Sequence, residues 1–144
     1  MIHAFLACAV CAWDCARTMR ILYVEDNEDL RETIGMLMEA DGRTVVPCES
    51  AERALELDAG VPFDVVVTDV SLPGLSGTDL AKQLLAVDPQ RCVVLCSGYE
   101  LGAYPQTWGR NVRILRKPFE IDELDALLAQ ITQVVASGPV PLGS

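Results

Sequence analysis

The stretch FDVVVT, Phe63–Thr68, decides the fold expected for this chain. It is rich in β-branched residues, which favour a strand. Its nearly continuous apolar character is typical of a strand that is buried on both faces of a parallel sheet. Asp69 follows at once, and residues 70–77 (VSLPGLSG) carry the Pro and Gly that mark a loop.

On either side of this strand, short apolar runs alternate with amphipathic stretches of helical period. The other expected strands are Arg20–Glu25, Thr44–Cys48, Arg91–Cys96 and Val112–Arg116. The expected helices are Asn27–Asp41, Ser50–Ala59, Thr78–Val87 and Glu120–Val135. Asn27 or Asp29 can cap the first helix and Ser50 the second, while Gly42 and Gly60 can end them.

Residues 98–109 follow the fourth expected strand and contain Gly102, Pro105 and Gly109. Any helix in this segment is therefore expected to be short or broken. Five strands that alternate with helices imply an α/β fold, with a parallel sheet covered on both faces. We expect a doubly wound, flavodoxin-like sheet in the order 2-1-3-4-5, which places strands 1 and 3 together at the switch point where ligands bind.

Length and composition restrict the possible classes of protein. The 144 residues suit one domain, and 51% of them are hydrophobic. The formal net charge of −10 argues against direct nucleic-acid binding and against binding to a bare anionic membrane. We expect a domain at residues 19–135, a disordered N-terminal extension at 1–18 and a disordered tail at 136–144. The residues after 135 are too few for a DNA-binding output domain, so we expect none unless this chain is a fragment of a longer protein.

The six cysteines do not suggest a disulfide framework. Cys48, Cys92 and Cys96 lie in or beside apolar runs, where a free thiol behaves as a small hydrophobe. We therefore expect reduced cysteines and a cytoplasmic protein.

The N-terminal extension carries weaker signals. The apolar run at residues 4–13 is too short to span a bilayer, and no Lys or Arg precedes it as in a signal peptide. Cys8, Cys11 and Cys15 are closely spaced thiols, but they lack a clear fourth metal ligand.

Polar residues follow four of the expected strands. Glu25 and Asp26 end the first, Asp69 ends the third, Ser97 ends the fourth, and Lys117 follows the fifth. In a parallel sheet these residues converge on one edge. Three carboxylates repel one another unless a cation joins them, and hard oxygen ligands favour Mg²⁺. Lys117 can pair with Asp69 at rest and with phosphate oxygens afterwards.

Each of these signals is weak by itself. An acidic pair after a strand is usually a solvated helix start, and an Asp at a strand end is commonly a turn former. Ser after a strand and Lys-Pro are ordinary too. The inference depends on all four appearing in order, each at the same end of a different strand.

Four stretches together resemble the receiver domains of bacterial response regulators and hybrid histidine kinases, in two-component signalling. The resemblance covers about residues 20–135 and is carried by ILYVEDNEDLR, VVVTDVSLPGLSG, VVLCSGY and RILRKPFEIDEL. It implies a phosphorelay domain that is not an enzyme acting on other substrates, but that assists its own phosphorylation and autodephosphorylation. The implied donor is a sensor histidine kinase or a histidine phosphotransfer protein, and the output passes to an unknown downstream protein.

The resemblance also implies a role for each site residue. Asp69 would accept the phosphoryl group. Mg²⁺ would be bound by Asp26, Asp69, the backbone carbonyl of Ser71, and Glu25 directly or through water. Ser97 and Lys117 would each contact a phosphoryl oxygen.

The loops around the site would have family features as well. Lys117-Pro118 would be a cis peptide bond. Pro73 and Gly74 would shape the loop after the acceptor, and Gly77 would allow the turn into the next helix.

Two positions depart from the family pattern or leave alternatives open. The family usually has an aromatic residue three positions before the Lys, acting as a rotamer switch, and here that residue is Ile114. Tyr99 either covers the phosphoryl group and slows its hydrolysis, or is simply a loop aromatic.

Two other functions compete with a phosphorylated receiver. A pseudo-receiver would be an interaction module that never takes phosphate, and the complete set of Asp26, Asp69, Ser97 and Lys117 argues against it. A haloacid dehalogenase-type phosphatase would need a second Asp two residues after its nucleophile, where this chain has Ser71.

Overall fold

The computed structural model of the protein describes residues 19–39, 42–102 and 104–137. The expectations for residues 1–18, including Cys8, Cys11 and Cys15, lie outside the described residues, as do those for 138–144. Within the described part, five parallel strands form one sheet in the order β2-β1-β3-β4-β5. The strands are β1 (Met19–Val24), β2 (Arg43–Cys48), β3 (Val65–Asp69), β4 (Cys92–Ser97) and β5 (Val112–Arg116). The predicted flavodoxin-like order is confirmed.

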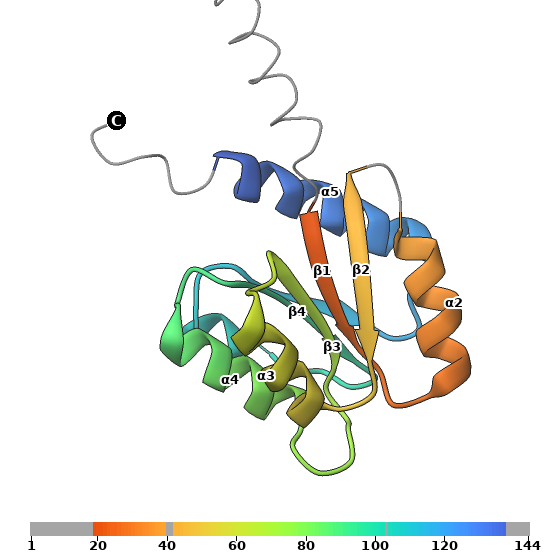
Figure 1. Cartoon of the computed structure of the whole chain (residues 1–144), viewed down its shortest axis with the longest axis horizontal. Coiled ribbons are helices and arrows are strands. Elements are labelled where there is room, and N and C mark those ends of the chain that lie inside the picture. The colour runs from red at the N-terminus through yellow and green to blue at the C-terminus, as the bar shows by residue number, and fades with distance from the viewer. Residues whose placement is uncertain (1–18, 40–41, 103, 138–144) are drawn as a thin grey trace, which may run out of the picture.

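Helices cover both faces of this sheet (Figure 1). They are α2 (Glu28–Met38), α3 (Ala51–Gly60), α4 (Gly77–Val87) and α5 (Ile121–Ser137). Helices α3 and α4 contact each other on one face, and α2 and α5 contact each other on the other (Figure 1).

Side-chain caps start three of the helices. The side chains of Asn27, Ser50 and Ser76 each accept a hydrogen bond from a backbone N–H of the first turn. Of the two candidate caps for α2, Asn27 is therefore the one used. The prediction that this helix continues to Asp41 and is closed by Gly42 is wrong. It ends at Met38, because Glu39 turns to an extended conformation and its N–H bonds the carbonyl of Met36.

Alternate residues of the strands supply the two sides of the core. Ile21 and Tyr23 of β1 face the layer of α2 and α5, where they pack with Leu124. Leu22 of β1 faces α3 and α4, where it packs with Leu80. Every residue of β3 is buried, as its sequence predicts. The core therefore holds the central strands firmly and fixes where their carboxyl ends lie.

Among its described residues, the segment between β4 and β5 forms only a short 3₁₀ helix, η1 (Tyr104–Thr107). The expectation of a short or broken helix here is confirmed. Gly102 has a φ of 67°, a left-handed conformation that favours glycine.

Strand β2 is at one edge of the sheet and contains Pro47. The N–H of Met19 donates to the carbonyl of Gly42, and that of Glu25 donates to the carbonyl of Cys48. The backbone N–H and C=O groups of the even-numbered β2 residues therefore point toward β1. The backbone nitrogen of Pro47 points away from β1, toward the open edge of the sheet. Its missing N–H removes no hydrogen bond from the sheet.

Candidate functional site

The site lies where the carboxyl ends of the strands meet. Asp69 is the last residue of β3 and is in register with Cys96 of β4. Ser97 ends β4 in register with Arg116, and Lys117 follows directly. The backbone N–H of Lys117 also donates to the carbonyl of Ser97 over 2.7 Å. Main-chain pairing thus sets the relative positions of these predicted residues.

Glu25, Asp26 and Asp69 form a cluster of carboxylates. Each offers an oxygen that lies within 4.8 Å of the others. Glu25 and Asp69 are buried, whereas Asp26 is exposed. Buried like charges this close are unfavourable without a cation. An all-oxygen set open to solvent on one side fits Mg²⁺, which usually keeps several of its waters.

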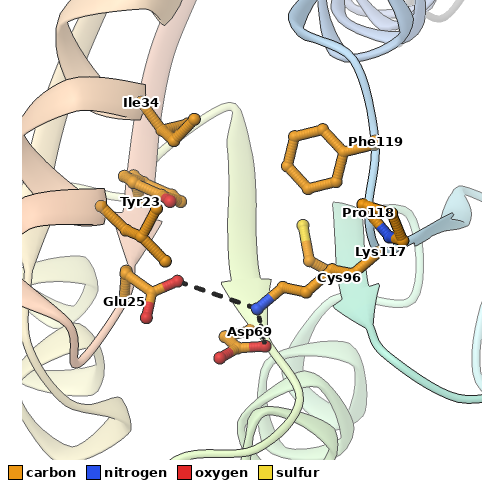
Figure 2. Close-up of a pocket in the computed structure, with 9 residues that line it drawn as sticks. Tyr23, Glu25, Ile34, Asp69, Cys96, Lys117, Pro118 and Phe119 are labelled. Atoms are coloured by element: carbon orange, nitrogen blue, oxygen red, sulfur yellow. Dashed lines mark hydrogen bonds and ion pairs between the residues drawn. The ribbon is translucent and has the colours of Figure 1, made fainter.

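Lys117 supplies a positive charge between Glu25 and Asp69 (Figure 2). Its Nζ donates to Oδ1 of Asp69 over 2.9 Å and lies 4.0 Å from Oε1 of Glu25. Burial opposes the charged form of Lys117, but the hydrogen bond and the charge of Asp69 outweigh it and raise the pKa of the ammonium. Lys117 therefore stays positively charged beside Asp69, the predicted phosphoryl acceptor.

The surroundings of Glu25 disfavour its charged form, whereas those of Lys117 favour the charged form. Burial raises its pKa, and the nearby charge of Asp69 adds to the effect, although a hydrogen bond from the N–H of Asn27 opposes it. The ionised form of Glu25 is thus stabilised when a further cation enters the cluster.

Two residues that the sequence prediction did not include in the site hold Glu25 in place. The N–H of Asn27 donates to Oε2 of Glu25 over 3.1 Å, and the Arg31 guanidinium donates to the Glu25 carbonyl over 2.9 Å. Asn27 was recognisable only as a helix cap. Arg31 is one helical turn further on, and no sequence signal marks it as a partner of the main chain.

The hydroxyl of Ser97 is bound to its own loop. Its Oγ donates to the carbonyl of Tyr99 over 2.7 Å and accepts from the Tyr99 N–H over 3.1 Å. The side chain of Ser97 is buried, while Tyr99 is 53% exposed. Ser97 therefore lies at the expected sheet edge, but its hydroxyl is engaged by Tyr99.

The loop after β3 passes close to the site. Gly77 packs so tightly against the carbonyl of Asp69 that a Cβ at this position would overlap it. Gly74 has a φ of 74°, and the N–H of Leu75 donates to the Glu52 carboxylate over 3.1 Å. The prediction that Gly77 permits the turn into the helix is confirmed. The anchoring by Glu52 of α3 was not predicted, because it joins residues far apart in the chain.

Two other predicted features lie on the loops of the site. The Lys117-Pro118 peptide bond is cis. Ser71 is exposed in the loop after β3. Its part in binding a metal remains a prediction.

Comparison with known proteins establishes the family. Residues 21–129 match the family model described as the response regulator receiver domain. The chain therefore belongs to the response regulator receiver domain family, which serves two-component signalling.

Three relatives illustrate the range of proteins that share this domain. The chain is 40% identical over 78 residues to the transcriptional regulatory protein FixJ of Azorhizobium caulinodans, covering 53% of this chain and 36% of FixJ. It is 35% identical over 82 residues to a cyclic di-GMP phosphodiesterase of Thermotoga maritima, covering 57% of this chain and 22% of the relative. It is 29% identical over 107 residues to the receiver protein CpdR of Brucella abortus, covering 73% and 89%. The chain thus spans only part of the first two.

Solved structures agree with this assignment. A receiver domain from Methylobacillus flagellatus superposes with a TM-score of 0.69 at 30% identity, covering 79% of this chain and 98% of that one. The response regulator TrrA of Thermotoga maritima, solved with Mg²⁺ and BeF, has a TM-score of 0.71 at 23% identity. It covers 79% of this chain and 99% of its own, and at this identity it supports the fold alone.

Among the described residues, no helix has both the length and the apolar character needed to cross a membrane.

Proposed function

We propose that this receiver domain takes a phosphoryl group onto Asp69 from a phosphohistidine of a sensor histidine kinase or a histidine phosphotransfer protein. Receiver domains in general interact with such partners. The observation that carries the proposal is the position of Asp69, which lies within 4.8 Å of two further carboxylates and 2.9 Å from the ammonium of Lys117.

The cluster of Glu25, Asp26 and Asp69 supports a magnesium site, and we propose the carbonyl of Ser71 as its fourth protein ligand. When bound, Mg²⁺ would neutralise the charge that gathers on the phosphoryl oxygens during transfer. The complex of TrrA with Mg²⁺ and BeF is consistent with this assignment.

Asp69 acts as the nucleophile in this proposal. Its carboxylate oxygen forms a bond to phosphorus while the bond from phosphorus to the imidazole nitrogen of the donor breaks. Lys117 moves from the carboxylate to a phosphoryl oxygen and offsets its charge. Because the chemistry needs positioning and charge neutralisation more than covalent help, no side chain besides Asp69 has to form a bond to phosphorus.

Ser97 responds to the phosphorylation of Asp69 in this proposal. To donate to a phosphoryl oxygen, its hydroxyl gives up the bond to the Tyr99 carbonyl. The loop after β4 then has two alternative arrangements, one for each partner of Ser97. This switch of Ser97 between two partners does not require an aromatic residue at position 114, where the chain has Ile114. We propose that the ring of Tyr99, a residue that is 53% exposed, covers the phosphoryl group in the second arrangement.

We further propose that residues 19–135 act as a cytoplasmic signalling unit and not as an enzyme on other substrates. The site assists loss of its own phosphoryl group to water. The signal passes to a downstream protein without direct contact with nucleic acid, in keeping with the net charge of −10.

Intact-mass measurement after incubation with Mg²⁺ and acetyl phosphate tests the proposal. The wild type should gain one phosphoryl group, and Asp69→Asn should gain none. Asp79→Asn, on the exposed first turn of α4, is the matched control and should behave as the wild type. If the wild type gains no phosphoryl group from acetyl phosphate or from any histidine kinase, the chain is a pseudo-receiver.

A further inference from the structure

A cavity of about 400 Å³ opens beside the carboxylate cluster, between α2 and the start of α5 (Figure 2). Its walls are mainly apolar and come from Leu30 and Ile34 of α2 on one side and Pro118 and Phe119 on the other. This volume falls in the range of small-molecule pockets in proteins, about 300–1,000 Å³. The phosphoryl transfer proposed above makes no use of these walls.

The floor of the cavity reaches the sheet. It is made by Tyr23 of β1 and Cys96 of β4, which are 5% and 3% exposed. A protein helix that rests on α2 would touch the rim at Leu30, which is 45% exposed. A compact molecule is better suited to fill a space that extends this far below the surface.

The hydroxyl of Tyr23 has no hydrogen-bond partner among the described residues, although the side chain is almost fully buried. Figure 2 shows the Tyr23 ring on one wall, with its oxygen toward the interior of the cavity. Among the described residues, Nε of Arg91 is the only buried side-chain polar atom without a partner, so the Tyr23 oxygen is accessible from the cavity and can bond a molecule there.

The polar end of the cavity carries more negative than positive charge. Glu25, Asp69 and Lys117 line it. Lys117 donates to Asp69, whereas its Nζ is 4.0 Å from Glu25, beyond hydrogen-bond distance. Glu25 therefore has room for a second cationic partner. The Arg31 guanidinium binds main-chain carbonyls and is not among the lining residues.

We propose that this cavity binds a small aromatic cation, a single ring with a protonated amine or amidine. The ring packs between Ile34 and Phe119, and the cationic group lies at Glu25, where it can also bond the Tyr23 hydroxyl. Planar amidinium groups match the geometry of a carboxylate, as guanidinium groups do. Because Glu25 also belongs to the proposed Mg²⁺ site, the aromatic cation and Mg²⁺ would compete for it.

Two probes of the same shape and opposite charge test the proposal on the full chain in metal-free buffer. Benzamidine carries a cation and benzoate an anion on the same ring, and titrations followed by protein NMR measure the affinity of each. Benzamidine should bind at least tenfold more tightly than benzoate. Equal or tighter binding of benzoate would show that Lys117 dominates the cavity and would overturn the proposal, as would failure of both probes to bind.

Variants locate the binding. Ile34→Trp fills the cavity and should abolish benzamidine binding, while Met36→Trp, at a position of the same helix that is 72% exposed, should leave it unchanged. Tyr23→Phe keeps the ring and removes the hydroxyl, and should weaken binding about threefold even if Ile34→Trp fails to fold. Glu25→Gln should weaken benzamidine binding about tenfold and spare benzoate. Unchanged benzamidine affinity in both Tyr23→Phe and Glu25→Gln would place the ligand elsewhere and refute the proposed cavity.

Discussion

The hydroxyl of Ser97 and the main chain of Tyr99 hold each other through two hydrogen bonds, of 2.7 and 3.1 Å. Ser97 is buried at the end of β4, and Tyr99 is largely exposed. One buried hydroxyl thus links the edge of the sheet to a surface residue. Any event that draws the hydroxyl away releases the main chain of Tyr99.

Phosphorylation of Asp69 should therefore change the backbone of Tyr99. We expect the amide resonance of Tyr99 to be among the most shifted signals in a ¹⁵N spectrum of the phosphorylated protein. In Ser97→Ala, which has no hydroxyl to change partners, the shift of the Tyr99 signal should fall to well under half of the shift in the wild type. An equal shift of the Tyr99 signal in the wild type and in Ser97→Ala would show that Ser97 takes no part in the switch.

Asp26→Asn should weaken Mg²⁺ binding about tenfold or more while the protein stays folded, because a charged oxygen ligand becomes a neutral one. Isothermal titration with Mg²⁺ measures the affinity. Asp29→Asn is the control, since Asp29 is in the first turn of α2 but outside the carboxylate cluster. Unchanged Mg²⁺ affinity in Asp26→Asn would remove Asp26 from the metal site.

Gly77→Ala should destabilise the fold by about 2 kcal/mol or more, since the new Cβ overlaps the carbonyl of Asp69 and main-chain atoms cannot move aside cheaply. Urea unfolding measures the change. In the control Gly60→Ala, no described atom beyond its chain neighbours and its own helix backbone lies within 4 Å of the new Cβ. Its stability should be unchanged or raised by up to about 1 kcal/mol. Equal stability of the two variants would contradict the close packing at Gly77.

A buried ion pair lies at the opposite end of the sheet from the site. Arg91 donates to both oxygens of Asp58 over 2.6 and 3.0 Å, and the N–H of Phe63 donates to Asp58 as well. Asp58→Asn should cost about 3 kcal/mol of unfolding free energy, because it leaves the Arg91 charge buried and unpaired. Glu56→Gln breaks an exposed pair with Arg53 and should cost about 0.5 kcal/mol or less. Similar losses in the two variants would mean that burial does not strengthen the Asp58 pair.

The same pair should make stability depend on pH. Burial opposes ionisation of Asp58, but the hydrogen bonds from Arg91 and Phe63 outweigh it and lower its pKa below the usual value of 3.8. A lowered pKa in the folded state means that the stabilisation is complete above the pKa of the unfolded chain. It is lost as the pH falls through the folded value. Unfolding from pH 6 to pH 2 should show a smaller loss of stability in Asp58→Asn than in the wild type, and parallel losses would contradict this.

The fold and the meeting of Lys117 with Asp69 were predictable because they depend on local pattern. Residues 65–67 are three valines, and their burial on both faces requires a central parallel strand. The polar residues after each strand then fall on one edge by topology alone, which is why Asp69 and Lys117 were expected to meet.

Other features of the site depend on contacts that sequence spacing does not reveal. The cavity floor joins Tyr23 of β1 to Cys96 of β4, and both residues look like ordinary core residues in the sequence. The predicted end of α2 at Asp41 was wrong because amphipathic character continued past the point where Glu39 turned the chain. The hydrogen bond from the Glu39 N–H to the Met36 carbonyl decided where the helix ends, and hydrophobic period does not encode it.

Pro47 has a consequence for how this molecule meets copies of itself. An open sheet edge is a template on which a strand from another molecule can add, and repeated addition leads to aggregates. On β2, the residues whose backbone groups point toward the open edge are Arg43, Val45 and Pro47. Pro47 offers no N–H to an incoming strand. The proline thus protects a protein with a highly apolar sheet from growing by edge-to-edge assembly on this side.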